Sequence, residues 1–188
     1  VPGKKTSLMK RKAEGADIRI VYSPMDALVL AQNSPLKKIV FLSVGFETTT
    51  PMTAVTAIEA RKQGVKNLFF LTAHKIVPPA MRALVDDKEL NISGFLLPGH
   101  VSAVIGKEPY EFLSSEYSIP GVITGFEPLD ILKGLNTLIS MINNRDYNII
   151  NEYKRIVRND GNSQAIEYLH KVFEVSDSTW RGIGTIPN

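Results

Sequence analysis

Two short segments of this sequence place the same residues, Gly-Phe-Glu, directly after an apolar run. The first is GFETTTP at 45–51 and the second is GFEPLD at 125–130. A helical pattern follows each segment. A carboxylate in this position is stabilised by the positive end of a helix dipole, or it faces a site where it transfers protons or binds a cation. Both roles stay open for Glu47 and Glu127.

Two of the three histidines also follow apolar runs. His74 ends the run NLFFLTA, and it is either a satisfied loop histidine or a site residue. His100 ends the turn Pro-Gly-His, in which Gly99 allows the backbone to approach a ligand closely. His170 lies within an amphipathic helical pattern, so we expect it at the surface or in packing.

These residues are positioned by an alternation of strand and helix patterns. Strand patterns cover 17–22, 37–44, 67–73, 92–97 and 121–124, and helical patterns cover 5–14, 25–33, 52–63, 80–87, 108–117 and 129–144. The alternation predicts an α/β fold, a Rossmann-like three-layer domain with a mostly parallel sheet. Two further helices, divided near Asp160-Gly161, are expected over 148–177 as a helical arm.

Parallel strands end at one edge of their sheet, and ligands of open α/β folds bind outside those carboxyl ends. Four loops leave strand ends here, at 44–50, 73–78, 98–102 and 124–128. The sequence therefore predicts that Glu47, His74, His100 and Glu127 lie on one rim and line a common hollow.

Composition excludes several classes of protein. The 188 residues include no cysteine, which excludes a disulfide-built domain and a cysteine-ligated metal within this chain. No apolar run is long enough to span a membrane and no signal-peptide core is present, so a cytoplasmic protein is expected. The net charge is +3, and the basic stretch 4–12 contains no aromatic residue, so we expect a solvated helix face and no nucleic-acid binding. The phosphate-binding glycine motifs are absent.

Four segments in this order resemble the HypD family, the hydrogenase formation proteins that mature [NiFe] hydrogenases. They are GFETTTP (45–51), PGHVSAVIG (98–106), GFEPLDIL (125–132) and INEYKRIV (150–157). The opening VPG and EGADIRIVYSPMDAL (14–28) are similar to that family as well. Members are longer, with cysteine motifs upstream and a cysteine group downstream that holds a [4Fe–4S] cluster. The resemblance implies that this chain is a central to C-terminal fragment without those cysteines, inactive alone.

The resemblance also implies a division of the chain into parts of three domains. Residues 1–44 would belong to a first α/β domain, and residues 45–125 to a second one across a cleft. Residues 126–188 would return to the first domain and begin the iron–sulfur domain. In the family, the protein pairs with the small chaperone HypC and carries the Fe(CN)2(CO) unit, whose cyanide comes from the HypE–HypF pair. It is an assembly scaffold more than a classical enzyme.

The two family motifs and the second Gly-Phe-Glu give the expected cleft residues. They are Gly45, Phe46, Glu47, Thr48, Thr49, Pro98, Gly99, His100, Val101 and Glu127. Thr48, Thr49 and His100 could donate hydrogen bonds to cyanide nitrogens, and Glu47 could relay protons or bind a partner's cation. The iron's anchors would be cysteines outside this chain, so no cofactor and no metal ligand is expected here and iron should bind weakly or not at all.

Two alternatives stay open beside the scaffold. The chain could be a small-molecule enzyme in which Glu47 is the acid/base and His100 its electrophilic or proton-transfer partner. It could also be an interaction module, in which the apolar helices and the 145–180 arm dock other proteins.

Overall fold

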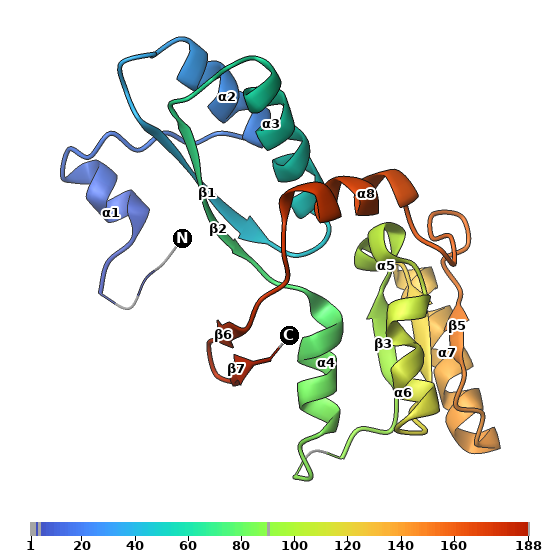
Figure 1. Ribbon diagram of the computed structural model, residues 1–188. Coiled ribbons are helices and arrows are strands. Elements are labelled where there is room, and N and C mark those ends of the chain that lie inside the picture. The colour runs from blue at the N-terminus through green and yellow to red at the C-terminus, as the bar shows by residue number, and fades with distance from the viewer. Residues whose placement is uncertain (1–2, 4, 90, 188) are drawn as a thin grey trace.

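The computed structural model describes residues 3, 5–89 and 91–187, so Val1, Pro2 and Lys4 of the opening motif and basic stretch lie outside the described residues. The described part contains two parallel sheets (Figure 1). β1 (Ile39–Gly45) pairs with β2 (Leu68–His74), and β3 (Phe95–Pro98), β4 (Gly121–Thr124) and β5 (Ile149–Asn151) form the second sheet in that order. The predicted α/β class with parallel strands is confirmed. The strands form two sheets, however, because the chain between β2 and β3 leaves the first sheet as a helix (Figure 1).

The first sheet is covered on one face by α2 (Pro24–Gln32) and α3 (Thr50–Lys62) (Figure 1). Pro24 occupies the first turn of α2, and Ser23 and Asp26 form a capping box there. Such signals explain why the sequence predicts this helix well. Ala31 of α2 and Ala54 of α3 are fully buried.

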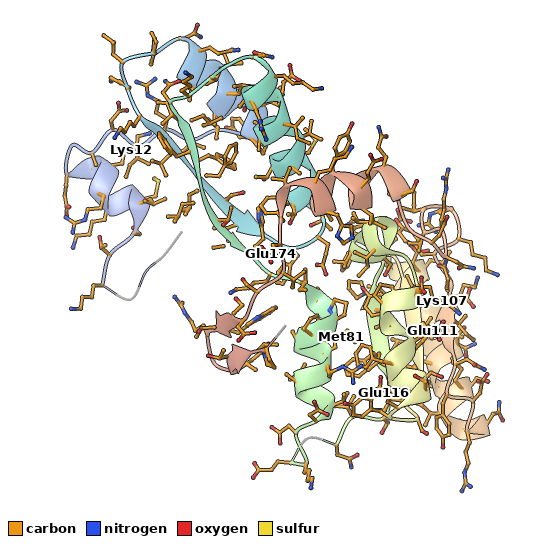
Figure 2. The ribbon with its side chains drawn as sticks, viewed as in Figure 1. Lys12, Met81, Lys107, Glu111, Glu116 and Glu174 are labelled. Atoms are coloured by element: carbon orange, nitrogen blue, oxygen red, sulfur yellow. The ribbon has the colours of Figure 1, made fainter. Side chains whose placement is uncertain are left out.

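In the N-terminal part, a predicted strand does not form and a predicted helix forms only in part. Residues 17–22 form no strand, and Tyr22 is 97% exposed, because this β-branched run pairs with neither β1 nor β2. The predicted helix at 5–14 is shorter in the structure, α1 (Leu8–Ala13), and buries none of its residues. Lys12, labelled on α1 in Figure 2, is exposed, as expected for a solvated helix face.

The second sheet is the middle of three layers. On one face lie α4 (Val77–Val85), α5 (Gly99–Ile105), the 3-10 helix η1 (Glu108–Tyr110) and α6 (Glu111–Ser115). Their side chains pack with those of the strands in a core of buried residues: Met81, Leu97, Tyr110, Leu113, Ile123, Ile149, Tyr153 and Val157. α7 (Pro128–Asn144) covers the other face, where Leu138 and Met141 contact Val122.

The prediction of the first of the two helices over 148–177, the one before Asp160-Gly161, is wrong. Ile149 and Ile150 pair in parallel with β4 as strand β5. The side chain of Asn151 then holds the following turn, because its Nδ2 donates to the Val157 carbonyl at 2.9 Å and its Oδ1 accepts from the Tyr153 amide at 2.9 Å. Such local side-chain bonds compete with helix formation.

The second helix predicted in the arm is confirmed as α8 (Ser163–Val172), which begins at its N-cap Asn162. Each parallel sheet and the helices packed on it form one unit. α8 contacts α3 of the first unit and α5 of the second, and so joins the two units (Figure 1). A short hairpin, β6 (Ser178–Trp180) with β7 (Gly184–Ile186), follows and lies beside α4. The predicted division at residues 44/45 and 125/126 stays a prediction. Among the helices of the described residues, none has the length and apolarity that a bilayer crossing requires.

Candidate functional site

A cavity of about 730 Å³ lies where the first sheet, the second unit, α8 and the hairpin meet. Its polar wall comes from the ends of β1 and β2 and includes Glu47, Thr50 and His74. Its apolar wall includes Ile105, Phe173 and Trp180. Glu174, labelled in Figure 2, lies where the chain leaves α8 towards the hairpin and also lines the cavity. The volume is that of a small-molecule site.

Glu47 has two different environments at its two carboxyl oxygens. The side chain is buried, with 3% exposure. Oε1 accepts a hydrogen bond of 2.7 Å from the amide of Val77, the first residue of α4. Because Pro78 and Pro79 have no N–H, Val77 carries one of the few free donors at this helix start. Oε2 has no hydrogen-bond partner among the described residues, and burial raises the pKa of this carboxyl.

The sequence left open whether Glu47 stabilises a helix start or faces a site, and the structure shows the first of these roles. Glu47 caps a helix, but the helix is α4 and not α3, which directly follows its own loop. Its second oxygen is buried and has no hydrogen-bond partner among the described residues, and Glu47 belongs to the wall of the cavity. Gly45 makes this loop possible, since a Cβ at that position would overlap the Thr49 hydroxyl. Thr49 and Thr50 donate to the Phe46 carbonyl at 3.2 Å and 2.8 Å and so close the turn.

His74 ends β2 at the position paired with Gly45 of β1, so it lies at the same sheet edge as the Glu47 loop. Its Nε2 is 3.0 Å from the Ser43 hydroxyl, which is 3.0 Å from the Thr53 hydroxyl. Its Nδ1 is buried without a partner among the described residues. The ring meets Phe173 edge to face at 5.3 Å, and burial lowers the pKa of the imidazole. Burial therefore favours the neutral form of the His74 ring.

Tyr110 brings the second unit close to this site. It is fully buried, and its hydroxyl accepts a long hydrogen bond of 3.5 Å from Ser102 on α5. Burial raises the pKa of Tyr110 to about 12, and the charge of an ionised Glu47 adds to this rise. The phenol therefore stays protonated and its electrostatics are coupled to Glu47.

The Pro-Gly-His-Val motif lies elsewhere. Pro98 precedes α5, Val101 is buried, and His100 is exposed with its ring 4.9 Å from Phe126 and 6.5 Å from Tyr153. A Cβ on Gly99 would overlap the Thr124 carbonyl and the Tyr153 ring, so glycine lets α5 start directly against β4.

Glu127 lies beside this second group and is exposed. It precedes α7 without a side-chain capping bond, and its Oε2 accepts from Arg155 at 3.2 Å. Arg155 also binds Asp130 through both nitrogens, at 2.7 Å and 2.6 Å, and lies over the Tyr153 ring. Hydrogen bonding to Arg155 lowers the pKa of Asp130.

The structure thus divides the predicted rim into two groups. Glu47 and His74 lie together at the edge of the first sheet, while His100 and Glu127 lie at the edge of the second. The prediction of one rim on one sheet is wrong, because the sheet is interrupted between β2 and β3. The enzyme alternative loses its proposed pair, since His100 is not among the described residues that line the cavity of Glu47.

Sequence reasoning also missed Ser43, Thr53 and Tyr110. They lie inside apolar or helical patterns, where a small hydroxyl or a phenol is read as packing. Only the pairing of β1 with β2 places Ser43 against His74. Over residues 3, 5–89 and 91–187, no group of three or more metal-ligating side chains occurs.

The fold and site define an α/β protein with a ligand-sized cavity between two parallel-sheet units. The model of the HypD family, described as "Hydrogenase formation hypA family", matches residues 1–188. The chain belongs to this family. The "Hydrogenase maturation factor HypD" of Escherichia coli K12 is 46% identical over 187 residues, and that of Rhodobacter capsulatus is 45% identical over 187 residues, each match covering 99% of this chain. The protein of that name from Cupriavidus necator is 44% identical over 96% of the chain. The chain spans about half the length of these curated relatives.

Proposed function

We propose that this chain is part of a hydrogenase maturation factor that serves as an assembly scaffold for the Fe(CN)2(CO) unit of [NiFe] hydrogenases. The names of its relatives support the maturation role. The single observation that carries the proposal is the position of Glu47. The Gly-Phe-Glu-Thr-Thr loop holds its carboxyl buried in the wall of a cavity, with one oxygen bound to the start of α4 and the other without a hydrogen-bond partner among the described residues.

Each side chain has a role that follows from its surroundings. Burial raises the pKa of Glu47, which favours a role for this carboxyl in proton relay. The hydroxyl of the exposed Thr48 and the ring of the exposed His100 could donate to cyanide nitrogens, whereas the Thr49 hydroxyl would first have to leave the Phe46 carbonyl. Iron is the cargo, and its anchors are cysteines of the longer protein. A [4Fe–4S] cluster in the longer protein would likewise depend on cysteines that this chain lacks.

The partners follow from the same proposal. A HypC-type chaperone would share the iron unit, and a HypE–HypF pair would supply cyanide, all within the cytoplasm. The face of α7 that is turned away from the second sheet is apolar, with Leu129 78% and Leu132 64% exposed, and it offers area for contacts of this kind.

The proposal is tested in the longer protein with Glu47→Gln and His100→Ala, numbered as in this chain. The readouts are hydrogenase activity in cells that lack their own factor, and the infrared cyanide bands of the purified complex with the HypC-type chaperone. We expect activity to fall at least about tenfold in each variant, the range for loss of a proton-transferring group. Glu167→Gln, an exposed glutamate on α8, is the matched control and should mature hydrogenase normally. Normal activity and unchanged bands in both test variants would overturn the proposal.

A further inference from the structure

The hairpin of β6 and β7 lies at the cavity but pairs with neither parallel sheet. Ser178, Trp180 and Ile186 belong to the cavity wall, and Ile186 is buried. The two strands have three residues each, and the hydroxyls of Thr179 and Thr185 lie 3.3 Å apart across them. A two-stranded hairpin is at best marginally stable in water on its own. Its position therefore depends on the side chains that bind it to the rest of the chain.

Lys75 is the first of these side chains. It follows His74 at the end of β2, and its amide donates to the Gly45 carbonyl at 2.9 Å. Its ammonium donates to the Ser178 hydroxyl and, at 3.3 Å, to the Thr179 carbonyl. The backbone of Lys75 thus binds the start of the Gly-Phe-Glu loop, while its side chain binds the hairpin.

Trp180 makes a second connection between the hairpin and the loop. Its ring centre lies 5.9 Å from that of Phe46, with the two rings tilted by 44°. The ammonium nitrogen of Lys75 lies 5.9 Å from the centre of the Trp180 ring. Aromatic pairs, and cations next to a tryptophan ring, attract each other at such separations. Trp180 therefore gives the exposed side chain of Phe46 an aromatic partner on the hairpin.

Phe46 connects the hairpin to Glu47. The Phe46 carbonyl accepts from the hydroxyls of Thr49 and Thr50, which close the turn. Glu47 is the next residue, and its carboxyl accepts from the Val77 amide at 2.7 Å. A displacement of Phe46 would therefore disturb both this turn and the bond between Glu47 and α4.

We infer that Lys75 and Trp180 are positioning residues, which hold the hairpin against Phe46 and so keep the Gly-Phe-Glu loop, with Glu47, in place. The inference rests on the proposed function in taking this loop as the working part of the site. It adds two residues that lie outside the four family segments of the sequence.

The first test measures the docking of the hairpin in the 188-residue chain, through its single tryptophan. Acrylamide quenching of Trp180 should rise at least about twofold in Lys75→Met, which removes the cation and its donors, and should stay at the wild-type level in Lys75→Arg. Arg181→Gln, which changes an exposed residue in the turn of the same hairpin, is the control and should leave quenching unchanged. Wild-type quenching in Lys75→Met would overturn the inference.

The second test measures the loop itself, by hydrogen exchange of the Thr50 and Val77 amides. The Thr50 amide donates to the Phe46 carbonyl and the Val77 amide to Glu47. Trp180→Ala should speed the exchange of both amides about fivefold, the effect of losing one aromatic contact, and Trp180→Phe should restore it. If Trp180→Ala fails to fold by circular dichroism, Lys75→Met decides, with the same expected change. Wild-type exchange of both amides in these variants would overturn the inference, because the hairpin would then have no effect on the loop.

The third test connects the loop to maturation in the longer protein, with residues numbered as in this chain. Trp180→Ala should lower hydrogenase activity at least about threefold, since a small displacement of a functional group is costly, and Trp180→Phe should restore it. Normal activity of Trp180→Ala, in an assay where Glu47→Gln is impaired, would overturn the inference. Should Glu47→Gln itself mature hydrogenase normally, the proposed function falls, whereas quenching and exchange still decide whether Lys75 and Trp180 hold the loop.

Discussion

At the scale of single residues, Glu47 combines a structural and a chemical task. Its carboxyl holds the start of α4 against the loop after β1, and its second oxygen is buried without a hydrogen-bond partner among the described residues. We predict that Glu47→Ala lowers the free energy of unfolding by about 1–2 kcal/mol, because the Val77 amide loses its acceptor. Urea denaturation measures this. Glu127→Ala, which removes an exposed ion pair, should cost less than about 1 kcal/mol. Equal losses in the two variants would mean that Glu47 is no more than a surface charge.

Gly99 is the residue that lets the Pro-Gly-His-Val motif start a helix against β4. We predict that Gly99→Ala lowers the free energy of unfolding by about 1–3 kcal/mol, because its Cβ would overlap the Thr124 backbone and Tyr153. Gln164→Ala on the exposed face of α8 is the control, and it should stay within about 0.5 kcal/mol. Thermal unfolding of both variants gives the comparison. A Gly99→Ala variant as stable as the control would show that α5 has room to move.

At the scale of elements, α8 contributes Ile166, Leu169 and His170 to the wall of the cavity. Its start depends on Asn162, whose Oδ1 accepts from the Ala165 amide at 3.0 Å. We predict that Asn162→Ala lowers the stability of α8 by about 1 kcal/mol, typical for loss of an N-cap. Hydrogen exchange should show faster exchange in 163–172 with little change in β1 and β2. Uniformly faster exchange in all elements would contradict a local role of this cap.

The elements also show what sequence can and cannot predict. α2 and α7 are recognised because Pro24 and Pro128 mark their starts, and α3 because Thr50-Pro51 marks its own. Segment 17–22 has the composition of a strand but finds no partner, and Ile149–Asn151 has helical spacing but pairs with β4. In both cases, whether the segment becomes a strand depends on whether the fold brings it next to the free edge of another strand. Such long-range pairing is not encoded in local periodicity.

For the candidate site too, the local positions of the residues could be predicted, whereas their grouping in space could not. Glu47 and His74 follow strands, and their loops were expected at a sheet edge. That His100 lies apart from them could not be predicted, because it depends on the break between the two sheets. Ser43 and Thr53 gain their role only through the register of β1 with β2 and the packing of α3 on that sheet.

At the scale of the whole molecule, burial shifts the pKa values of two groups in the cavity wall, which makes stability depend on pH. Burial lowers the pKa of His74 below its usual 6.5 and raises that of Glu47 above its usual 4.5. The unfolded chain therefore takes up a proton on His74 before the folded one does, so this contribution is present above the unfolded pKa and is lost as pH falls. Glu47 acts in the opposite direction, with a contribution that is lost as pH rises through its raised pKa.

The two effects are separated in a Glu47→Gln background. There we predict that acidification through the normal histidine range destabilises the protein with His74 more than the one with His74→Gln, measured by urea denaturation at each pH. Parallel pH profiles would contradict a buried neutral His74.

The central claim is that Glu47 and His74 form one functional site at the junction of the two units. The most direct measurement is hydrogenase activity matured by the longer protein with Glu47→Leu, with His74→Phe and with both. We predict that each single variant lowers activity at least about tenfold, and that the double variant falls little further, because groups of one site are not additive. Independent, multiplying losses, or full activity in both single variants, would contradict the claim.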